Sequence, residues 1–252
     1  MPFYERQEMI LNALLESDHI TTQELSAKLF VSVPTLRRDL MKLEQMGKII
    51  RTHGGARLIK KSADEKIPIF LREKEQNDAK EIMAQKAVEF VRDGDIIMLD
   101  GSTSAYTIIP YLADFKNLIV ITSSAKSSFL LGRMGINTIC TGGKMITRSL
   151  SYIGEDAENT VKQYNADIVF FSCRGLSMDG KLTDNSIEEN SLRRIMLRHA
   201  KKRVFLCDST KVGHTYLNNL CHLSEVDEII CEQVLPENLH DMVKSTANGH
   251  DI

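Results

Sequence analysis

The sequence has 252 residues, of which 42% are hydrophobic and 26% charged, and its formal net charge is −2. These values are typical of a globular protein with room for two domains or one large α/β domain. No apolar run approaches the roughly 20 residues that cross a bilayer, and the N-terminus lacks the basic-then-apolar order of a signal peptide. We therefore exclude a membrane-spanning or secreted protein and expect a cytoplasmic one.

The cysteine pattern supports the same compartment. The chain contains five cysteines and no Cys-x-x-Cys pair, which indicates reduced, mostly buried thiols. They are Cys140, Cys173, Cys207, Cys221 and Cys231. Two cysteines and two histidines late in the chain could be read as zinc ligands, but their spacing matches no common zinc site. These four are Cys207, His214, Cys221 and His222. We expect neither a metal nor a cofactor.

Two short helical patterns open the chain. The first covers residues 6–15, where isoleucine and leucine recur at helical spacing. Thr21 and Glu24 form a capping box that starts the second helix, Thr22 to Leu29. Residues 30–31 then make a short turn before the next helix.

The third predicted helix has two contrasting sides. Ser32 can cap its start, Pro34 fits the first turn, and Gly47 closes it. The narrow apolar side consists of Val33, Leu36, Leu40 and Leu43. The opposite side consists of Pro34, Thr35, Arg38, Met41 and Lys42, with Arg37 on the flank. A short helix that buries one stripe and turns cations outward predicts insertion into the major groove of DNA.

The region around this helix is basic although the whole chain is not. Between Lys28 and Lys61 only Asp39 and Glu44 are acidic. The cations there are Lys28, Arg37, Arg38, Lys42, Lys48, Arg51, Arg57, Lys60 and Lys61. One concentrated basic segment favours a nucleic-acid-binding head on a neutral-to-acidic body. Charge alone would equally allow a solvated surface.

A hairpin pattern follows the third helix. Gly54 and Gly55 lie between two β-prone runs, 48–52 and 57–59. A basic two-stranded wing beside a recognition helix predicts a winged helix-turn-helix. The polar, aperiodic stretch that comes next is interpreted as a linker. The predicted divisions are a DNA-binding domain, 1–60, a linker, 61–76, and an effector and oligomerisation domain, 77–252.

Three motifs of this head occur together in a known family. They are Arg6, Ile10 and Leu14, then Ser32-x-x-Thr35-Leu36-Arg37-Arg38-Asp39-Leu40, then Arg51-Thr52-His53-Gly54-Gly55-Ala56. They resemble the DNA-binding signature of the DeoR family of bacterial sugar-operon regulators.

The residues of the head can be given roles from their positions. We expect Thr35 and Arg38 to reach base edges and the other cations to contact phosphates. The candidate DNA-binding residues are Ser32, Thr35, Arg37, Arg38, Lys42, Arg51, His53 and Arg57. Arg37 could instead pair with Asp39 or Glu44, and His53 could be an idle turn residue.

From residue 77 onward, helical stretches, the first of them over residues 79–92, alternate with short apolar runs. The predicted strands are 95–99, 118–121, 137–140, 167–171, 203–207 and 228–231. This alternation predicts an α/β domain with a mainly parallel sheet covered on both faces. In such sheets ligands bind at the carboxyl ends of the strands. Residues 236–252 are predicted to form a final helix with a frayed end.

Small hydroxyl residues gather at three of these strand ends. Residues 100–104, Asp-Gly-Ser-Thr-Ser, follow the first strand, residues 122–124 follow the second, and residues 208–211 include Lys211. A helix N-terminus binds anions through its backbone N–H groups, and a lysine suits a phosphate dianion. The sequence therefore predicts a phosphorylated small ligand.

These loops, with Gly142-Gly143, Gly175-Leu176 and Gly180-x-Leu182-Thr183, resemble the DeoR sensor-domain motifs. The resemblance implies the α/β fold of ribose-5-phosphate isomerase, glucosamine-6-phosphate deaminase and the CoA transferases, with a sugar-phosphate site. The residues implied for that site are Asp100, Ser102, Thr103, Ser104, Thr122, Ser123, Arg174, Gly175, Glu188 and Lys211.

Two positions depart from the family pattern. Ser172-Cys173-Arg174-Gly175 stands where the family has roughly Gly-Ala-Asp-Gly, and Ser104 replaces a threonine. Arg174 could bind a phosphate or carboxylate, or it could be an exposed loop residue.

The combined patterns predict a transcription regulator. We expect a repressor of a carbohydrate operon that binds double-stranded operator DNA as a symmetric homo-oligomer and responds to a phosphorylated sugar. An alternative is an isomerase-like enzyme in which four residues, Asp100, Asp208, Glu188 and Lys211, move protons, although a basic head has no use there. A second alternative is a DNA-binding activator whose body only oligomerises.

Overall fold

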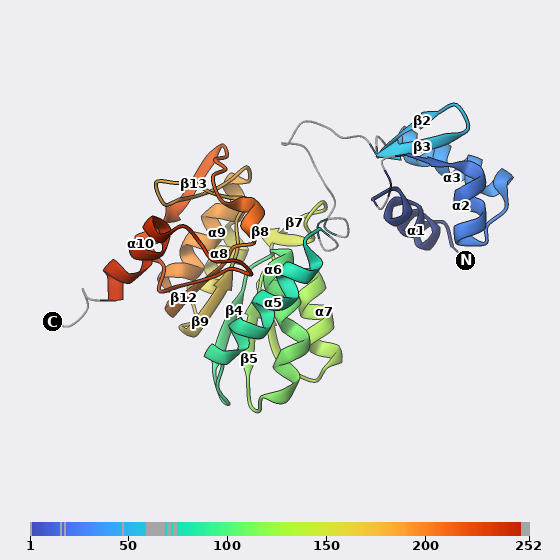
Figure 1. The fold of residues 1–252 in the computed structure, drawn as a ribbon. Helices are drawn as coiled ribbons and strands as arrows, with labels where there is room; N and C mark the ends of the chain where they lie inside the picture. The colour runs from blue at the N-terminus through green and yellow to red at the C-terminus, as the bar shows by residue number, and fades with distance from the viewer. Residues whose placement is uncertain are drawn as a thin grey trace. The chain divides into compact units, whose positions relative to one another are not determined.

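The computed structural model describes residues 2–15, 17, 19–46, 48–58, 69, 72 and 75–247. The chain forms two compact units, Met1–Lys74 and Glu75–Ile252, coloured blue and green to red in Figure 1. Most of the predicted linker, 61–76, lies outside the described residues, as does Gly47. Within the described ranges, no helix combines the length and the apolar character that crossing a bilayer requires.

The described part of the N-terminal unit contains three helices and a small antiparallel sheet. The helices are α1 (Phe3–Leu15), α2 (Thr22–Leu29) and α3 (Val33–Gln45), and the strands are β1 (Ile20–Thr21), β2 (Ile49–Thr52) and β3 (Gly55–Leu58). The strand order is β1-β3-β2. This arrangement is the predicted winged helix-turn-helix. It differs in that α1 begins at Phe3 and β1 adds a third strand.

The head folds around aliphatic side chains from every helix and from the wing. Those exposed by no more than 2% are Ile10, Leu11, Ala13, Leu14, Leu25, Leu36, Leu40, Leu43, Ile49 and Ala56. The predicted capping box of α2 is confirmed. The Thr21 hydroxyl accepts from the Glu24 N–H at 3.2 Å, and the Glu24 carboxylate accepts from the Thr21 N–H at 2.8 Å.

The wing turn is tighter than predicted. It consists of His53 and Gly54, and Gly55 already pairs with Thr52 inside the hairpin. A Cβ atom at Gly55 would lie 2.3 Å from the carbonyl oxygen of Ile20. Glycine is therefore required at position 55 because β1 and β3 approach each other closely.

The C-terminal unit is built on one six-stranded sheet in which every neighbouring pair is parallel. Its strands are β4 (Ile96–Leu99), β5 (Ile119–Thr122), β6 (Asn137–Cys140), β9 (Ala166–Phe171), β12 (Ala200–Leu206) and β14 (Glu228–Ile230). They lie in the order β14-β12-β9-β4-β5-β6. These are the six predicted apolar runs, so the predicted α/β class is confirmed.

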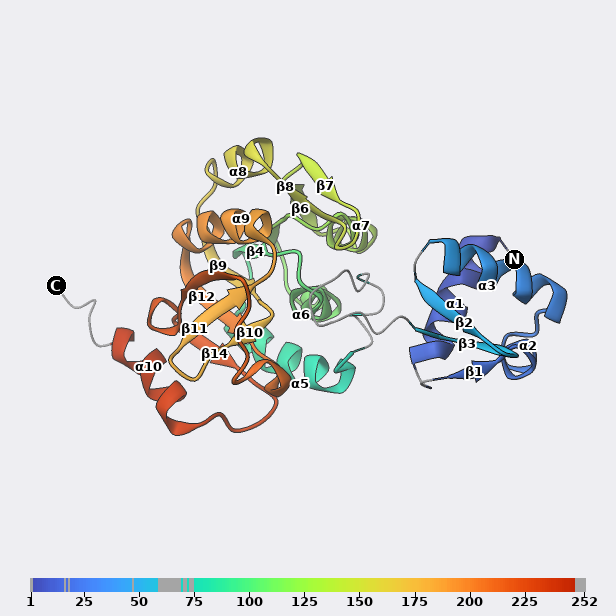
Figure 2. The same ribbon diagram turned by 90° about the horizontal axis from the view of Figure 1, so that it is seen from above.

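Helices cover both faces of this sheet (Figure 2). One face carries α5 (Asn77–Ala87), α6 (Thr103–Ile108) and α7 (Ala125–Arg133), and the other carries α8 (Glu155–Val161), α9 (Ile187–Arg198) and α10 (Glu237–Ala247). Successive strand residues point to opposite faces. In β4, Ile97 and Leu99 therefore enter the core on the face covered by α5, α6 and α7. Met98 enters the core on the face covered by α8, α9 and α10. Burial on both faces explains the uninterrupted apolar runs.

Shorter elements complete the unit. β7 (Lys144–Ile146) and β8 (Ser151–Ile153) form a hairpin, and β10 (Gly175–Leu176), β11 (Lys181–Asp184) and β13 (Asn218–His222) form a small sheet. The 3₁₀ turns are η1 (Val88–Phe90), η2 (Ile109–Asp114), η3 (Ser209–Lys211) and η4 (Leu223–Glu225). The apolar pattern does not predict these strands, because each is only two to five residues long and most carry polar side chains.

Two predicted helices differ from the observed ones at their ends. The helix expected near residues 79–92 is α5, which ends at Ala87 and continues as η1. The helix expected over 236–252 is α10, which buries Leu239 and Val243. Residues 248–252 lie outside the described part of the chain.

Candidate functional site

The N-terminal unit presents one side of α3 to solvent. Its predicted leucines are buried, and Val33 is half-buried. The exposed residues of α3 are Pro34, Arg37, Arg38, Met41, Lys42, Glu44 and Gln45, with Thr35 half-buried beside them. The helix therefore has the two sides that its sequence predicts, one packed in the head and one available to a groove.

An ion pair fixes α3 to α1. Arg6 donates to both carboxylate oxygens of Asp39, from Nε at 2.7 Å and from Nη2 at 3.0 Å, and Asp39 is only 2% exposed. Donation to the Asp39 carboxylate raises the pKa of Arg6. Because Asp39 binds Arg6 and Glu44 lies beside Arg51, the alternative pairing of Arg37 is not formed among the described residues.

Ser32 stands at the N-cap position of α3 but does not cap it. Its hydroxyl shares a hydrogen bond with the Thr35 hydroxyl at 2.9 Å instead of accepting one from a backbone N–H. The predicted cap bond is therefore wrong. No side chain therefore caps this end of α3, and in its first turn Pro34 has no N–H while the Leu36 N–H donates to the Ser32 carbonyl at 3.0 Å.

The remaining candidate DNA contacts lie at the end of α3 and on the wing. The Lys42 ammonium lies 4.7 Å from the centre of the Phe3 ring, and the Arg51 guanidinium lies 3.6 Å from the Glu44 carboxylate. His53 and Arg57 are exposed. None of the eight candidate residues is buried, so each is accessible to a duplex.

The predicted ligand loops lie at the carboxyl edge of the parallel sheet. The Ser102 hydroxyl caps α6 by accepting from the Ala105 N–H at 3.1 Å. The Ser124 hydroxyl caps α7 in the same way by accepting from the Ser127 N–H at 3.1 Å. The Thr122 hydroxyl accepts from the Ser124 N–H at 3.1 Å. These hydroxyls hold the loops in shape. The other candidate hydroxyl residues, also buried, are Thr103, Ser104 and Ser123.

Asp100 organises this edge from within, with only 1% of its surface exposed. One carboxylate oxygen accepts from the Ser102 N–H at 3.1 Å and from the Ser102 hydroxyl at 2.5 Å. The other accepts from Arg193 Nε at 2.8 Å and from the Ser172 N–H at 3.4 Å. Asp100 therefore ties together the loops after β4 and β9 and the helix α9.

Arg193 is a buried residue that the sequence patterns do not single out. Its Nη1 donates to Asp184 at 2.9 Å and to Asn190 at 3.0 Å, in addition to the bond from Nε to Asp100. Burial disfavours its charge, but Asp100 and Asp184 more than compensate, and the pKa of Arg193 rises. Its position among the buried residues of α9 is the signal that could have identified it, because a cation on an apolar face needs buried partners.

Lys211 lies in η3, the turn that follows β12, and contacts the loop after β9. Its Nζ donates to the Ser172 hydroxyl at 2.7 Å and lies 3.0 Å from the Asp208 carboxylate. Burial disfavours the ammonium, but Asp208 outweighs burial and the pKa of Lys211 rises. Burial likewise opposes ionisation of Asp208, yet Lys211 lowers its pKa. Both groups stay charged at neutral pH.

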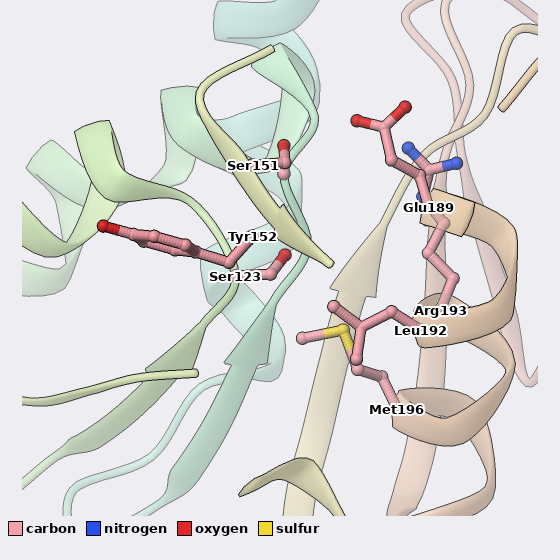
Figure 3. Close-up of a pocket in the computed structure, with 8 residues that line it drawn as sticks. Ser123, Ser151, Tyr152, Glu189, Leu192, Arg193 and Met196 are labelled. Carbon is pink, nitrogen blue, oxygen red and sulfur yellow. The ribbon is translucent and has the colours of Figure 1, made fainter. Parts of the chain in front are cut away.

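A small, partly open pocket lies beside this network, with about 210 Å³ of empty space that includes open solvent. Ser123 and Ser151 lie on one wall, and Glu189 and Arg193 lie on the other (Figure 3). The remaining lining residues are Gly101, Tyr152, Leu192 and Met196. Hydroxyl groups that face charged groups suit a polar, hydroxyl-bearing ligand.

The structure places Glu188 outside this pocket. Glu188 is exposed on α9, whereas the next residue, Glu189, lines the pocket and lies 3.9 Å from Arg148. Successive helical residues differ by about 100° in direction, so only one of two neighbouring glutamates can face the pocket.

Arg174 and Gly175 lie in the loop after β9. The Arg174 guanidinium lies 3.9 Å from Asp184 and 6.0 Å from the centre of the Tyr216 ring, and the residue is half-buried. A Cβ atom at Gly175 would lie 2.4 Å from the carbonyl oxygen of His214. Because Gly175 has no side chain, the loop after β9 can pack closely against the segment that contains His214.

Two cysteines that follow strands of the sheet, Cys173 after β9 and Cys231 after β14, are buried. Burial raises the pKa of Cys173 to about 12 and that of Cys231 to about 11, so both thiols stay protonated. No group of three or more potential metal ligands occurs among the residues that the structure describes.

A helix-turn-helix unit with outward-facing arginines, joined to an α/β unit with a polar pocket, defines a DNA-binding protein with a sensor domain. Comparison with known families identifies it more closely. A DeoR-like helix-turn-helix domain model matches residues 6–62, and a DeoR C terminal sensor domain model matches residues 75–233. The chain therefore belongs to the DeoR family.

Curated relatives match almost the whole chain. The HTH-type transcriptional regulator GolR of Listeria innocua is 34% identical, over 94% of this chain and 93% of that protein. The L-fucose operon activator of Escherichia coli K12 is 31% identical, over 90% and 94%. The putative aga operon transcriptional repressor of Escherichia coli O157:H7 is 27% identical, over 92% and 87%.

Among solved structures, ribose 5-phosphate isomerase A from Methanocaldococcus jannaschii is similar at a TM-score of 0.42. It is 19% identical and covers 54% of this chain and 55% of its own. Because the matched families and named relatives are regulators, this chain is a DNA-binding transcriptional regulator and not an enzyme. The isomerase alternative is therefore excluded.

Proposed function

We propose that this regulator represses a carbohydrate operon and that a phosphorylated sugar bound at the carboxyl edge of the sensor sheet controls it. The observation that carries the proposal is the Lys211 loop. Its ammonium lies 2.7 Å from the Ser172 hydroxyl, and two helix N-termini, capped by Ser102 and Ser124, lie at the same edge of the sheet. A charged ammonium, hydroxyls and helix N-termini are the groups that hold a phosphate dianion.

The neighbouring pocket supports a sugar as the rest of the ligand. Ser123, Ser151 and Glu189 line it with hydroxyl and carboxylate groups, which pair with sugar hydroxyls. The names of the relatives support a carbohydrate operon, since one is an L-fucose operon activator and another a putative aga operon repressor.

The head supplies the other half of the proposed function. We propose that Thr35 and Arg38 read base edges, that the remaining candidate residues of the head position the duplex, and that two or more heads bind in a symmetric homo-oligomer. A single small head buries too little surface for a specific operator.

Substitution of Lys211 tests the ligand site. Lys211→Ala is expected to leave operator affinity unchanged and to remove the thermal stabilisation that the wild type shows with one or more members of a panel of aldose and ketose phosphates. Lys201→Ala is a matched control, because Lys201 pairs with Asp167 at the opposite edge of the sheet and should behave as wild type. A normal ligand response in Lys211→Ala would place the phosphate elsewhere.

Activation is the second candidate function, favoured by the name of the L-fucose operon activator. Transcription in vitro from a promoter that carries the operator separates the two. Repression predicts fewer transcripts when the protein is added, and activation predicts more.

A further inference from the structure

The parallel sheet of the sensor unit ends in two edge strands of different character, β14 and β6, which lie at opposite ends of the sheet (Figure 2). Proteins protect strand edges with charged side chains, proline or a covering element. β14 carries Glu228, paired with Lys202 at 3.2 Å, and the Cys231 carbonyl just past the strand accepts from Lys86 Nζ at 2.8 Å. β6 contains neither a charged residue nor a proline, so its edge lacks this protection.

The free backbone groups of β6 lie on the side away from β5, its one partner strand among the described residues. The Thr141 N–H, just past β6, donates to the Thr122 carbonyl of β5 at 3.0 Å. Backbone groups of alternate residues point to the same edge of a strand. Ile139 therefore turns its N–H and C=O toward β5, whereas Thr138 and Cys140 turn theirs away. Within the described part of the chain, these outward N–H and C=O groups have no backbone partner.

Apolar side chains flank the same edge. Ile139 is half-buried and packs against the core on the face covered by α8, α9 and α10. On the other face, α7 packs against β6 and carries Phe129, which is 68% exposed. An uncharged strand edge with free backbone groups and apolar neighbours is a template for pairing with another chain.

We propose that β6 pairs in antiparallel orientation with β6 of a second copy of this chain, about a two-fold axis at Ile139. This inference rests on the symmetric homo-oligomer of the proposed function. In this register Thr138 lies opposite Cys140 of the second copy, and each such pair exchanges two N–H···O bonds. Every outward group of β6 is then satisfied. Because β6 carries no charge, the two copies meet without like charges opposite each other.

The ends of the strand exclude the two neighbouring registers. An axis at Thr138 would place Cys140 opposite Ile136, whose N–H and carbonyl are already hydrogen-bonded within its own chain. An axis at Cys140 would place Thr138 opposite Gly142, whose φ of 65° is not extended. The axis at Ile139 alone pairs extended residues that have free backbone groups.

A proline at position 138 tests the interface in the full chain. Thr138→Pro removes an outward N–H but no hydrogen bond to β5, and proline is tolerated at such positions of edge strands. It is expected to halve the molar mass that light scattering gives for the wild type. Thr138→Val is the matched control, because it loses the hydroxyl but keeps the N–H, and it should have the wild-type mass.

A disulfide between copies tests the register, and it does so even if Thr138→Pro fails to fold. Across the axis, the Cα atoms of position 139 should lie about 4.5 Å apart, a distance that a disulfide spans. Ile139→Cys in a Cys140→Ser background, oxidised with diamide, is therefore expected to give about tenfold more covalent dimer than the wild type. In the wild type, Cys140 and its copy are diagonal neighbours, too far apart to bridge.

The failures can be told apart. If the wild type is an oligomer but Thr138→Pro folds and keeps its mass, the β6 interface is wrong and the proposed oligomer stands. The same holds if Ile139→Cys gives no more covalent dimer than the wild type. If the wild type is a single chain both with and without operator DNA, the proposed oligomer fails and the β6 interface fails with it.

Discussion

At the scale of single residues, Arg38 is the position proposed to read the base sequence of the operator. It is exposed on the outward side of α3, one residue before the buried Asp39 that anchors the helix to Arg6. The anchor fixes the direction of α3, and with it the direction in which Arg38 projects.

Arg38→Ala is expected to weaken operator binding by about 1–3 kcal/mol and to relax base preference at one position of each half-site. Titration against the operator and its single-base variants measures both effects. Arg37→Ala is the comparison, since a lost phosphate contact should weaken all sequences alike. Base discrimination that is unchanged in Arg38→Ala would remove it as a base reader.

The Asp208–Lys211 pair gives the sensor unit a defined pH range. Asp208 has a lowered pKa in the folded state, so its contribution to stability is present above its unfolded pKa and is lost as pH falls through the folded value. Lys211 has a raised pKa, so its contribution is present below its unfolded pKa and is lost as pH rises through the folded value. Both contributions are complete between about pH 4 and about pH 10.

Asp208→Asn should therefore reduce the free energy of unfolding at pH 7 and flatten its dependence on pH below about 4. Urea unfolding of the full chain at a series of pH values, followed through the sensor-unit transition, measures this. If wild type and variant lose stability in parallel on acidification, the pair does not contribute as described.

The sequence patterns place the loops of the candidate site at one edge of the sheet but do not reveal the buried residues that support them. Ser102 and Lys211 were predictable because they follow apolar strands, and the ends of parallel strands meet at one edge. Arg193 and Glu189 lie on a helix distant in sequence, and Ser151 lies on a short hairpin strand. Whether such residues reach the site depends on tertiary packing, which helical periodicity alone does not give.

At the scale of elements, the hairpin β7–β8 closes against the loop after β4. A Cβ atom at Gly101 would lie 2.0 Å from Ser151 Oγ and 2.9 Å from Ser151 Cβ. The hairpin can therefore approach the ligand loop only because position 101 has no side chain.

Gly101→Ala is expected to destabilise the sensor unit by about 1–3 kcal/mol, the usual cost of overpacking, and to weaken ligand binding. Adding Ser151→Gly should restore much of the loss, because it removes both clashing atoms. Thermal unfolding of the single and double variants measures the coupling. Gly132→Ala is the control, since open space surrounds that position of α7 and the change should be neutral or stabilising. Additive effects of the two substitutions would contradict the contact.

Comparing the predicted strands with the observed ones shows which elements a sequence specifies by itself. All six strands of the parallel sheet were predictable because burial on both faces gives continuous apolar runs. The short strands β1, β7, β8, β10, β11 and β13 were not, since each is held by pairing with a partner strand or by a close approach such as that at Gly55. The residue pattern within a short strand carries no information about the strand with which it pairs.

At the scale of the whole molecule, the salt dependence of operator binding reports how many heads engage the duplex. Each neutralised phosphate contributes about −0.9 to the slope of log K against log salt. The cations proposed to contact phosphates in each head are Arg37, Lys42, Arg51 and Arg57. Two heads therefore predict a slope of about −7 and one head about −3.5. Because a symmetric operator needs at least two heads, we expect the steeper value.

Arg57→Ala should make this slope shallower by about 2 in a two-headed complex, since one phosphate contact is lost from each head. Fluorescence anisotropy with labelled operator across a range of salt concentrations gives both slopes. Lys201→Ala should leave the slope unchanged, because Lys201 lies on the sensor sheet and pairs with Asp167. A wild-type slope near zero would contradict phosphate contact by the head. A change of about 1 for Arg57→Ala would show that a single head holds the DNA.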